Sequence, residues 1–262
     1  MKVNVNDIQI NYDVSGKQGA QVVMLSHSLG SSLAMWDAQM EALELHYKVL
    51  RYDMRGHGGS DAPQGAYTLG QLGEDAVGLL DALNIEVVHW VGLSMGGMIG
   101  QYLALNYADR LRSLVLCDTA AAIPEDGRAM RQERIEIARE KGLEALVEPT
   151  LNRWFTPAYR GQNPPQVELI REQFLATSVG GYIGCSEAIM GLNYLERLHE
   201  IRTPTLNIVG EDDPGTPVSL SEAIYERIEG SRLVVLKSAA HLSNVEQSEA
   251  FNRALIGFLL DH

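Results

Sequence analysis

The chain has 262 residues, of which 45% are hydrophobic and 21% charged, an ordinary balance for a globular protein. Its formal net charge is −13, from 21 Lys and Arg against 34 Asp and Glu. This sign repels phosphate backbones and anionic lipid, so it argues against nucleic acid and membrane surfaces as partners. A substrate with a carboxylate would need local positive charge to overcome this field.

Two cysteines, Cys117 and Cys185, lie far apart and form no C-x-x-C motif. Isolated cysteines without a disulfide framework are typical of a reducing compartment, so we expect a cytoplasmic protein. The first residues lack the apolar core of a signal peptide, and no apolar run approaches the length of a transmembrane helix.

Short apolar runs alternate with helical patterns over residues 1–119. The runs predict strands at Ile8–Val14, Val22–Leu25, Tyr47–Asp53, Val87–Val91 and Leu114–Leu116. Apolar residues at helical spacing predict helices near residues 72–83 and 98–105. Fully apolar strands separated by helices are typical of a parallel sheet that is covered on both faces.

The pattern changes between residues 120 and 197, where charged helical segments surround a break at residues 163–165 and no buried-strand run appears. We interpret residues 120–197 as an inserted helical cap, and residues 1–119 and 198–262 as the core. Two ordinary crossover helices with long loops are the alternative. The core pattern resumes with strands at Thr205–Gly210 and Arg232–Leu236 and with helices at residues 219–229 and 245–260.

The main chemical signal is the segment Gly92-Leu93-Ser94-Met95-Gly96, which lies between a predicted buried strand and an apolar helix. This is the context of the G-x-S-x-G turn that presents a nucleophilic serine in α/β-hydrolases. The glycines let strand and helix pass closely, and the helix N-terminus favours negative charge near the serine. A glycine-rich turn with an incidental serine is the alternative.

A serine hydroxyl is a weak nucleophile at neutral pH and requires an oriented base. His241 follows the last predicted strand, at the same sheet edge as Ser94, and comes after it in the chain order that this fold requires. The remaining histidines fit less well, because they precede strands, lie within one, stand at the terminus or come before Ser94. His241 is therefore the predicted base.

The acid that orients the histidine should follow a strand between Ser94 and His241. Glu211, Asp212 and Asp213 all follow the strand that ends near Gly210. The proline after Asp213 favours that residue mildly, with Asp212 second and Asp118 a less favoured position.

The oxyanion formed during acyl transfer needs two N–H donors. We expect one from Met95, directly after the nucleophile, and one from the loop at residues 26–30, where Leu29 is the best candidate. We expect His27 to brace its loop by hydrogen bonds, with a part in proton transfer as the alternative. We expect His57 to lie in a scaffold turn, with a position facing the pocket as the alternative. The sequence holds no phosphate loop and no metal-ligand spacing, so no cofactor and no metal are expected.

Nine segments together resemble the 3-oxoadipate enol-lactonases, a group within the α/β-hydrolase superfamily. They are Leu25–Gly30, Met35–Trp36, Arg51–Gly58, Gly92–Gly97, Leu116–Ala120, Arg153–Phe155, Cys185–Ile189, Gly210–Pro217 and Ala239–Glu246. The resemblance covers nearly the whole chain. It implies an α/β-hydrolase fold, with a mostly parallel central sheet, helices on both faces and an inserted helical cap. It also places the acid at the aspartate before Pro214, which is Asp213.

Members of this group open an unsaturated five-membered lactone with an acetate side chain, giving 3-oxoadipate in the degradation of aromatic compounds. The resemblance thus implies a small anionic substrate and a cap residue that holds its carboxylate. Arg153 beside Trp154 is the first candidate, with a plain surface position as the alternative, and Trp36 is a further expected contact. Many related hydrolases have His-Gly where this chain has His27-Ser28, a difference that these lactonases tolerate.

The same core and catalytic residues also serve other reactions. A carboxylesterase that cleaves small short-chain esters is the main alternative function. A non-catalytic protein of this fold that binds a small molecule is the second alternative.

Overall fold

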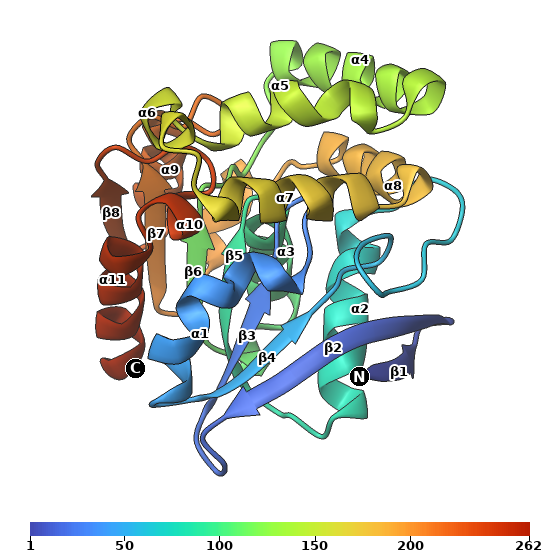
Figure 1. Cartoon of the computed structure of the whole chain (residues 1–262). Coiled ribbons are helices and arrows are strands. Elements are labelled where there is room, and N and C mark those ends of the chain that lie inside the picture. The colour runs from blue at the N-terminus through green and yellow to red at the C-terminus, as the bar shows by residue number, and fades with distance from the viewer.

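The computed structural model describes residues 1–124 and 127–262. Over these residues, an eight-stranded sheet with the order β1-β2-β4-β3-β5-β6-β7-β8 forms the centre of the molecule (Figure 1). Its strands are β1 (Lys2–Val5), β2 (Ile8–Gly16), β3 (Val22–Ser26), β4 (Lys48–Tyr52), β5 (Val88–Leu93), β6 (Leu111–Cys117), β7 (Thr205–Gly210) and β8 (Arg232–Leu236). The β1–β2 and β2–β4 pairs are antiparallel, whereas all the other neighbours are parallel.

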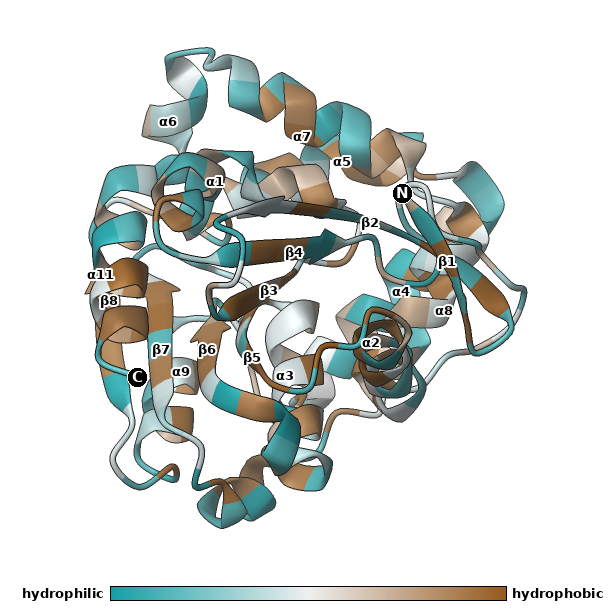
Figure 2. Ribbon diagram, turned by 90° about the horizontal axis from the view of Figure 1, so that it is seen from below, coloured by the Kyte–Doolittle hydropathy of each residue, from teal (hydrophilic) through white to brown (hydrophobic). Residues whose placement is uncertain are grey.

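Helices cover both faces of this sheet, as Figure 2 shows from below. One face carries α1 (Asp37–Glu44) and α11 (Ser248–Leu260), and the other carries α2 (Leu69–Ala82), α3 (Met95–Asn106) and α9 (Val218–Tyr225). Every residue of the central strands β5 and β7 is buried. This double cover explains why these strands are apolar runs rather than alternating ones.

Five helices lie between β6 and β7 in the sequence. They are α4 (Glu125–Lys141), α5 (Glu144–Trp154), α6 (Pro157–Gly161), α7 (Pro165–Ala176) and α8 (Val179–Met190), and we call them the cap helices. Figure 1 shows them over the edge of the sheet at which the parallel strands end. The predicted fold class is confirmed, whereas the exact cap boundaries at residues 120 and 197 stay a prediction.

Two features of the core differ from the sequence-based expectation. Strand β1 was not expected, because Lys2 and Asn4 make it short and polar. The helix predicted at residues 245–260 is two helices, α10 (Ser243–Glu246) and α11, which are separated at Gln247. Short 3-10 turns lie at η1 (Leu33–Trp36), η2 (Ala108–Arg110) and η3 (Leu195–Glu200).

A close backbone contact joins the cap helices to the core. A Cβ atom added at Gly181 of α8 would lie 2.2 Å from the carbonyl oxygen of Gly56, and one at Gly56 would lie 2.5 Å from the Cα atom of Gly181. Only glycine permits this approach, so α8 is seated directly on the loop after β4. No described helix combines the length and the hydropathy that crossing a bilayer would require.

Candidate active site

Ser94 occupies the sharp turn between β5 and α3, with φ 56° and ψ −113°. This conformation is rare for a residue with a side chain, and neighbouring contacts hold it in place. The Ser94 N–H donates to the carbonyl of Cys117 at 2.8 Å, and the Thr119 hydroxyl donates to the carbonyl of Ser94 at 2.7 Å. A Cβ atom at Gly92 would lie 2.1 Å from the carbonyl oxygen of Gly96, so the turn requires glycine there.

An aspartate–histidine pair lies at the same edge of the sheet, on the loops after β7 and β8. The Nδ1 atom of His241 lies 2.7 Å from Oδ2 of Asp213. Of the two aspartates weighed at this turn, Asp213 is 3% exposed and Asp212 is exposed. The geometry therefore pairs the histidine with the acid that the resemblance implies.

The Asp213 carboxylate accepts three further hydrogen bonds from its own turn. The donors are the N–H of Gly215 at 2.7 Å, the N–H of Thr216 at 3.0 Å and the Thr216 hydroxyl at 2.5 Å. Burial alone would raise the pKa of Asp213, but the nearby His241 and the two Thr216 donors hold that pKa below its ordinary value. Thr216, which the sequence analysis missed, thus keeps the acid ionised. Its position just after the Asp-Pro-Gly turn was the available signal.

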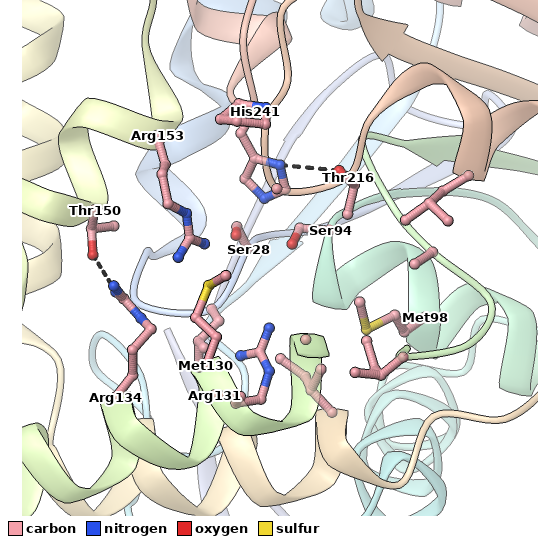
Figure 3. A pocket seen from close by; sticks show the side chains of 18 of the residues that line it. Ser28, Ser94, Met98, Met130, Arg131, Arg134, Thr150, Arg153, Thr216 and His241 are labelled. Carbon is pink, nitrogen blue, oxygen red and sulfur yellow. Dashed lines mark hydrogen bonds between the residues drawn. The ribbon is translucent and has the colours of Figure 1, made fainter. Parts of the chain in front are cut away.

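Ser94 and His241 both line a cavity of about 350 Å³ between the core and the cap helices. Figure 3 shows the His241 ring directed toward the side of the cavity where Ser94 lies. Leu29, Met98 and Trp154 also line it, so its walls combine apolar surface with a few polar groups. This composition is typical of a small-molecule site.

The expected oxyanion donors lie on two backbone segments beside Ser94. Leu29 lines the cavity, and Met95 opens helix α3 directly after the serine. Within the described residues, neither of these N–H groups donates to a protein acceptor. Both are therefore available to an oxygen atom of a substrate.

Two buried histidines brace the loop that carries Leu29, as expected. The His57 Nε2 atom accepts the N–H of Gly30 at 2.9 Å, and the His27 Nε2 atom accepts the N–H of Met54 at 3.0 Å. Burial, together with the neighbouring His27, lowers the pKa of His57 to about 3, so this ring stays neutral and able to accept.

Asp118, the less favoured acid, has a different place. Its carboxylate accepts the N–H of Gly210 at 2.8 Å and the hydroxyl of Ser243 at 2.5 Å, and it is fully buried. Burial and the nearby Asp213 raise its pKa. Asp118 thus joins the end of β7, just before the turn of Asp213, to the start of α10, just after the loop of His241.

Three arginines of the cap helices line the cavity, Arg131 and Arg134 from α4 and Arg153 from α5. The described lining residues include no Asp or Glu. Arg134 donates to the Tyr182 hydroxyl at 3.2 Å and to the Thr150 hydroxyl. Of the two positions weighed for Arg153, on the surface or at the pocket, the structure has the second, since Arg153 lines the cavity. Arg131 and Arg134 were missed, although their three-residue spacing places them on one face of a helix.

The two predicted tryptophan contacts have different outcomes. Trp154 lines the cavity, with its ring edge-on to Phe174 at 5.8 Å between centroids. Trp36 is fully buried on η1, where it packs near Phe251 at 6.2 Å. Trp36 is not among the described lining residues of the cavity, so the structure does not bring it to the site. Over the same described residues, no group of three His, Cys, Asp or Glu side chains is placed to hold a metal ion.

A serine held between glycines on a strand–helix turn, with an Asp–His pair at the same edge of a mostly parallel sheet, defines the α/β-hydrolase class. Comparison with known proteins agrees with this class. A family model described as alpha/beta hydrolase fold matches residues 21–248.

Relatives of known name narrow the class. The chain is 38% identical to 3-oxoadipate enol-lactonase 2 of Acinetobacter baylyi, over 97% of this chain and 94% of that protein. The structure is similar to the crystal structure of the enol-lactonase from Burkholderia xenovorans, with a TM-score of 0.96 over 99% of this chain and 100% of that one, and the two sequences are 38% identical. It is also 30% identical to a putative carbamate hydrolase, RutD, of Agrobacterium fabrum, over 96% of this chain and 98% of that protein. The chain therefore belongs to the alpha/beta hydrolase fold family, as a relative of the 3-oxoadipate enol-lactonases, and is a carboxylic ester hydrolase.

Proposed function

We propose that the protein opens 3-oxoadipate enol-lactone, a small carboxylate-bearing ester, to 3-oxoadipate through an acyl-enzyme. The observation that carries this proposal is the cavity itself, which joins Ser94 and His241 of the core to arginines of the cap helices. Two of these, Arg131 and Arg153, have no hydrogen-bond or ion-pair partner among the described residues. The named relatives add support, because two of them are enol-lactonases.

In the proposed mechanism, Ser94 attacks the lactone carbonyl while His241 removes the hydroxyl proton and Asp213 orients the ring. The N–H groups of Leu29 and Met95 stabilise the tetrahedral oxyanion. His241 then protonates the leaving enolate oxygen as the ring opens. Water, activated by the same histidine, attacks the acyl-enzyme and releases the product and Ser94.

Substrate selection in this proposal comes from the cap helices. Arg153 binds the carboxylate of the lactone, and Trp154 packs against the ring. A guanidinium inside a partly enclosed cavity attracts a carboxylate more strongly than one in water, because the effective dielectric constant is lower there.

The decisive experiment compares kcat/KM for the enol-lactone with kcat/KM for neutral short-chain p-nitrophenyl esters. We expect the lactone to be preferred by about 10-fold or more, the value of a charge-assisted hydrogen bond. A preference for the neutral esters would favour the carboxylesterase alternative instead.

Replacement of Ser94 by Ala tests the nucleophile. We expect kcat to fall by about 10⁴-fold or more, because the remaining site keeps only binding and the oxyanion donors. A fluorophosphonate probe should label the native protein at Ser94. An unlabelled, correctly folded protein would instead support the non-catalytic binding alternative.

A further inference from the structure

The cavity carries a charge opposite to that of the whole chain. The protein has a formal net charge of −13, yet the titratable side chains that line the cavity include three arginines and, among the described residues, no carboxylate. Arginines are common in proteins, but buried ones are normally paired with an acid. This excess of positive charge therefore indicates an anionic ligand.

The three arginines are not equivalent. Arg134 is held in place by the hydroxyls of Tyr182 and Thr150. Arg131 and Arg153 have neither a hydrogen bond nor an ion pair to the described part of the chain, and the Nε atom of each is buried without a partner. Burial lowers the pKa of both guanidiniums, that of Arg131 to about 10. Arginine side chains in proteins stay protonated at neutral pH.

The two unpaired guanidiniums enter the cavity from different elements. Arg153 comes from the end of α5, and its Nη2 atom would lie 3.8 Å from a Cβ atom at Gly215, next to the acid turn. Arg131 comes from α4 and points toward Ser94 from that helix, as Figure 3 shows. One carboxylate neutralises one guanidinium, so a monoanionic ligand would leave the other half-buried with its Nε atom unpartnered.

We propose that Arg131 and Arg153 are two separate anion-binding positions, and that the cavity binds a short aliphatic dicarboxylate. This inference rests on the proposed function, in which a ring-opening reaction converts a monoanion into a dianion that stays in one piece. Water breaks the acyl C–O bond, and the new carboxylic acid releases its proton to solvent. Arg153 holds the carboxylate that the substrate brings, and Arg131 holds the one that hydrolysis creates once it leaves Ser94.

Binding of adipate and hexanoate, two chains of equal length that differ by one carboxylate, tests this inference. Calorimetric titration of the native enzyme should give a dissociation constant for adipate about 10-fold or more below that for hexanoate, the value of one charge-assisted hydrogen bond. Arg131→Gln and Arg153→Gln should each remove most of this advantage. Either arginine alone can hold one carboxylate, so each single variant should change hexanoate binding by about 2-fold at most.

Arg139→Gln is the matched control, because Arg139 lies on the same helix and is exposed. It should leave both dissociation constants unchanged. Arg131→Lys keeps the charge and should retain part of the adipate preference. This variant provides a second test if Arg131→Gln fails to fold. In turnover assays, Arg131→Gln should weaken inhibition by adipate about 10-fold, because the dicarboxylate then loses the partner of one carboxylate.

Two results would overturn the inference. Equal binding of adipate and hexanoate by the native enzyme would show that there is no second position. Equal weakening of both ligands by Arg131→Gln would show that the two arginines share one carboxylate. Neither measurement requires turnover, so the two proposals can fail separately. If the protein shows the expected binding of adipate but does not open the lactone, the proposed function is wrong and the dicarboxylate site is supported.

Discussion

Asp212 and Asp213 are neighbours on one turn, but only one of them can orient His241. The Asp213 carboxylate is buried and lies 2.7 Å from the ring, whereas Asp212 is exposed. Replacement of Asp213 by Asn should lower kcat by about 10⁴-fold, because the amide favours the wrong histidine tautomer and does not stabilise the imidazolium. The measurement is kcat on the preferred ester or lactone.

Asp212→Asn is the control for this prediction, since it removes the same charge one residue away. It should change kcat by less than about 2-fold, as expected of an exposed position. A large loss in Asp212→Asn together with an active Asp213→Asn would mean that the acid is assigned to the wrong residue.

The choice between these two acids shows what sequence spacing can and cannot predict. A strand end followed by Glu211, Asp212 and Asp213 predicts that an acid is present at this edge. It does not predict which carboxylate turns inward, because that depends on the N–H and O–H donors of Gly215 and Thr216. Those donors are placed by the turn, and the turn only becomes visible in three dimensions.

His57 makes the stability of the protein depend on pH. The pKa of its ring is about 3 in the folded state, against 6.5 ordinarily, so between these values the unfolded chain binds a proton that the folded chain does not. Its contribution is therefore complete above about pH 6.5 and decreases as the pH falls toward 3, at up to about 1.4 kcal/mol per pH unit.

His57→Gln tests this dependence, because a glutamine oxygen can accept the Gly30 N–H without titrating. Urea unfolding should be measured at pH 7.5, 5.5 and 4.5. As the pH falls below 6.5, the free energy of unfolding should decrease less steeply in the variant than in the native protein, by up to about 1.4 kcal/mol per pH unit, the effect of one proton. Parallel curves would contradict the assigned pKa.

At the scale of whole elements, the predicted strands are confirmed because burial on both faces leaves an unmistakable apolar run. Strand β1 escaped prediction because it is short and polar at Lys2 and Asn4. The break at Gln247 escaped prediction because helical periodicity continues through it, and the chain direction changes without a proline or glycine. The orientation of the cap helices on the core is likewise set by contacts that the sequence does not reveal, such as Gly56 against Gly181.

One cap helix also positions the loop that carries Leu29. The side-chain oxygen of Gln173 on α7 accepts the Ser31 hydroxyl at 2.9 Å and the Ser32 N–H at 3.2 Å. Gln173 is not among the described residues that line the cavity, so it acts on the loop rather than on the substrate. Gln173→Ala should lower kcat by about 10-fold, the value of one or two neutral hydrogen bonds, and leave KM nearly unchanged.

Affinity for a boronic acid that mimics the tetrahedral state separates positioning from general instability. In Gln173→Ala this affinity should fall in parallel with kcat, while the affinity for hexanoate stays the same. Gln166→Ala on the same helix is the control, because Gln166 is exposed and its loss should change neither quantity. A rise in KM without a change in kcat would place Gln173 in substrate binding instead.

At the scale of the whole molecule, the site is divided between two parts of the chain. The meeting of Ser94, Asp213 and His241 at one edge could be predicted, because the ends of parallel strands always share an edge. The arginines could not be placed in the same way. Their direction depends on how α4 and α5 lie over the core, and a charged helix face is more often directed to solvent than to a cavity.

Two hydrogen-bonded links join the cap helices to the loop of His241. The Leu242 N–H donates to the carbonyl of Trp154 at 3.0 Å. The Glu246 carboxylate accepts the N–H of Ala240 at 3.0 Å, the N–H of Thr156 at 3.2 Å and the Thr156 hydroxyl. Since Arg153 directly precedes Trp154, these links set the position of α5, and with it the proposed carboxylate-binding Arg153, relative to the proposed base.

Thr156→Val removes one donor to the buried Glu246 carboxylate while it keeps the shape of the side chain. We expect the free energy of unfolding to fall by about 1.5–3 kcal/mol, the value of a hydrogen bond to a charged group, in urea titrations. Because α5 then shifts relative to His241, kcat/KM for an anionic lactone should fall more than kcat/KM for a neutral ester. Thr177→Val is the control, since the Thr177 hydroxyl donates to the main-chain carbonyl of Gln173 at the C-terminal end of α7 and makes no bond to Glu246. Thr177→Val should lower kcat/KM for the two substrates by the same factor, if at all. If Thr156→Val also lowers both kcat/KM values equally, the link stabilises the fold without positioning Arg153.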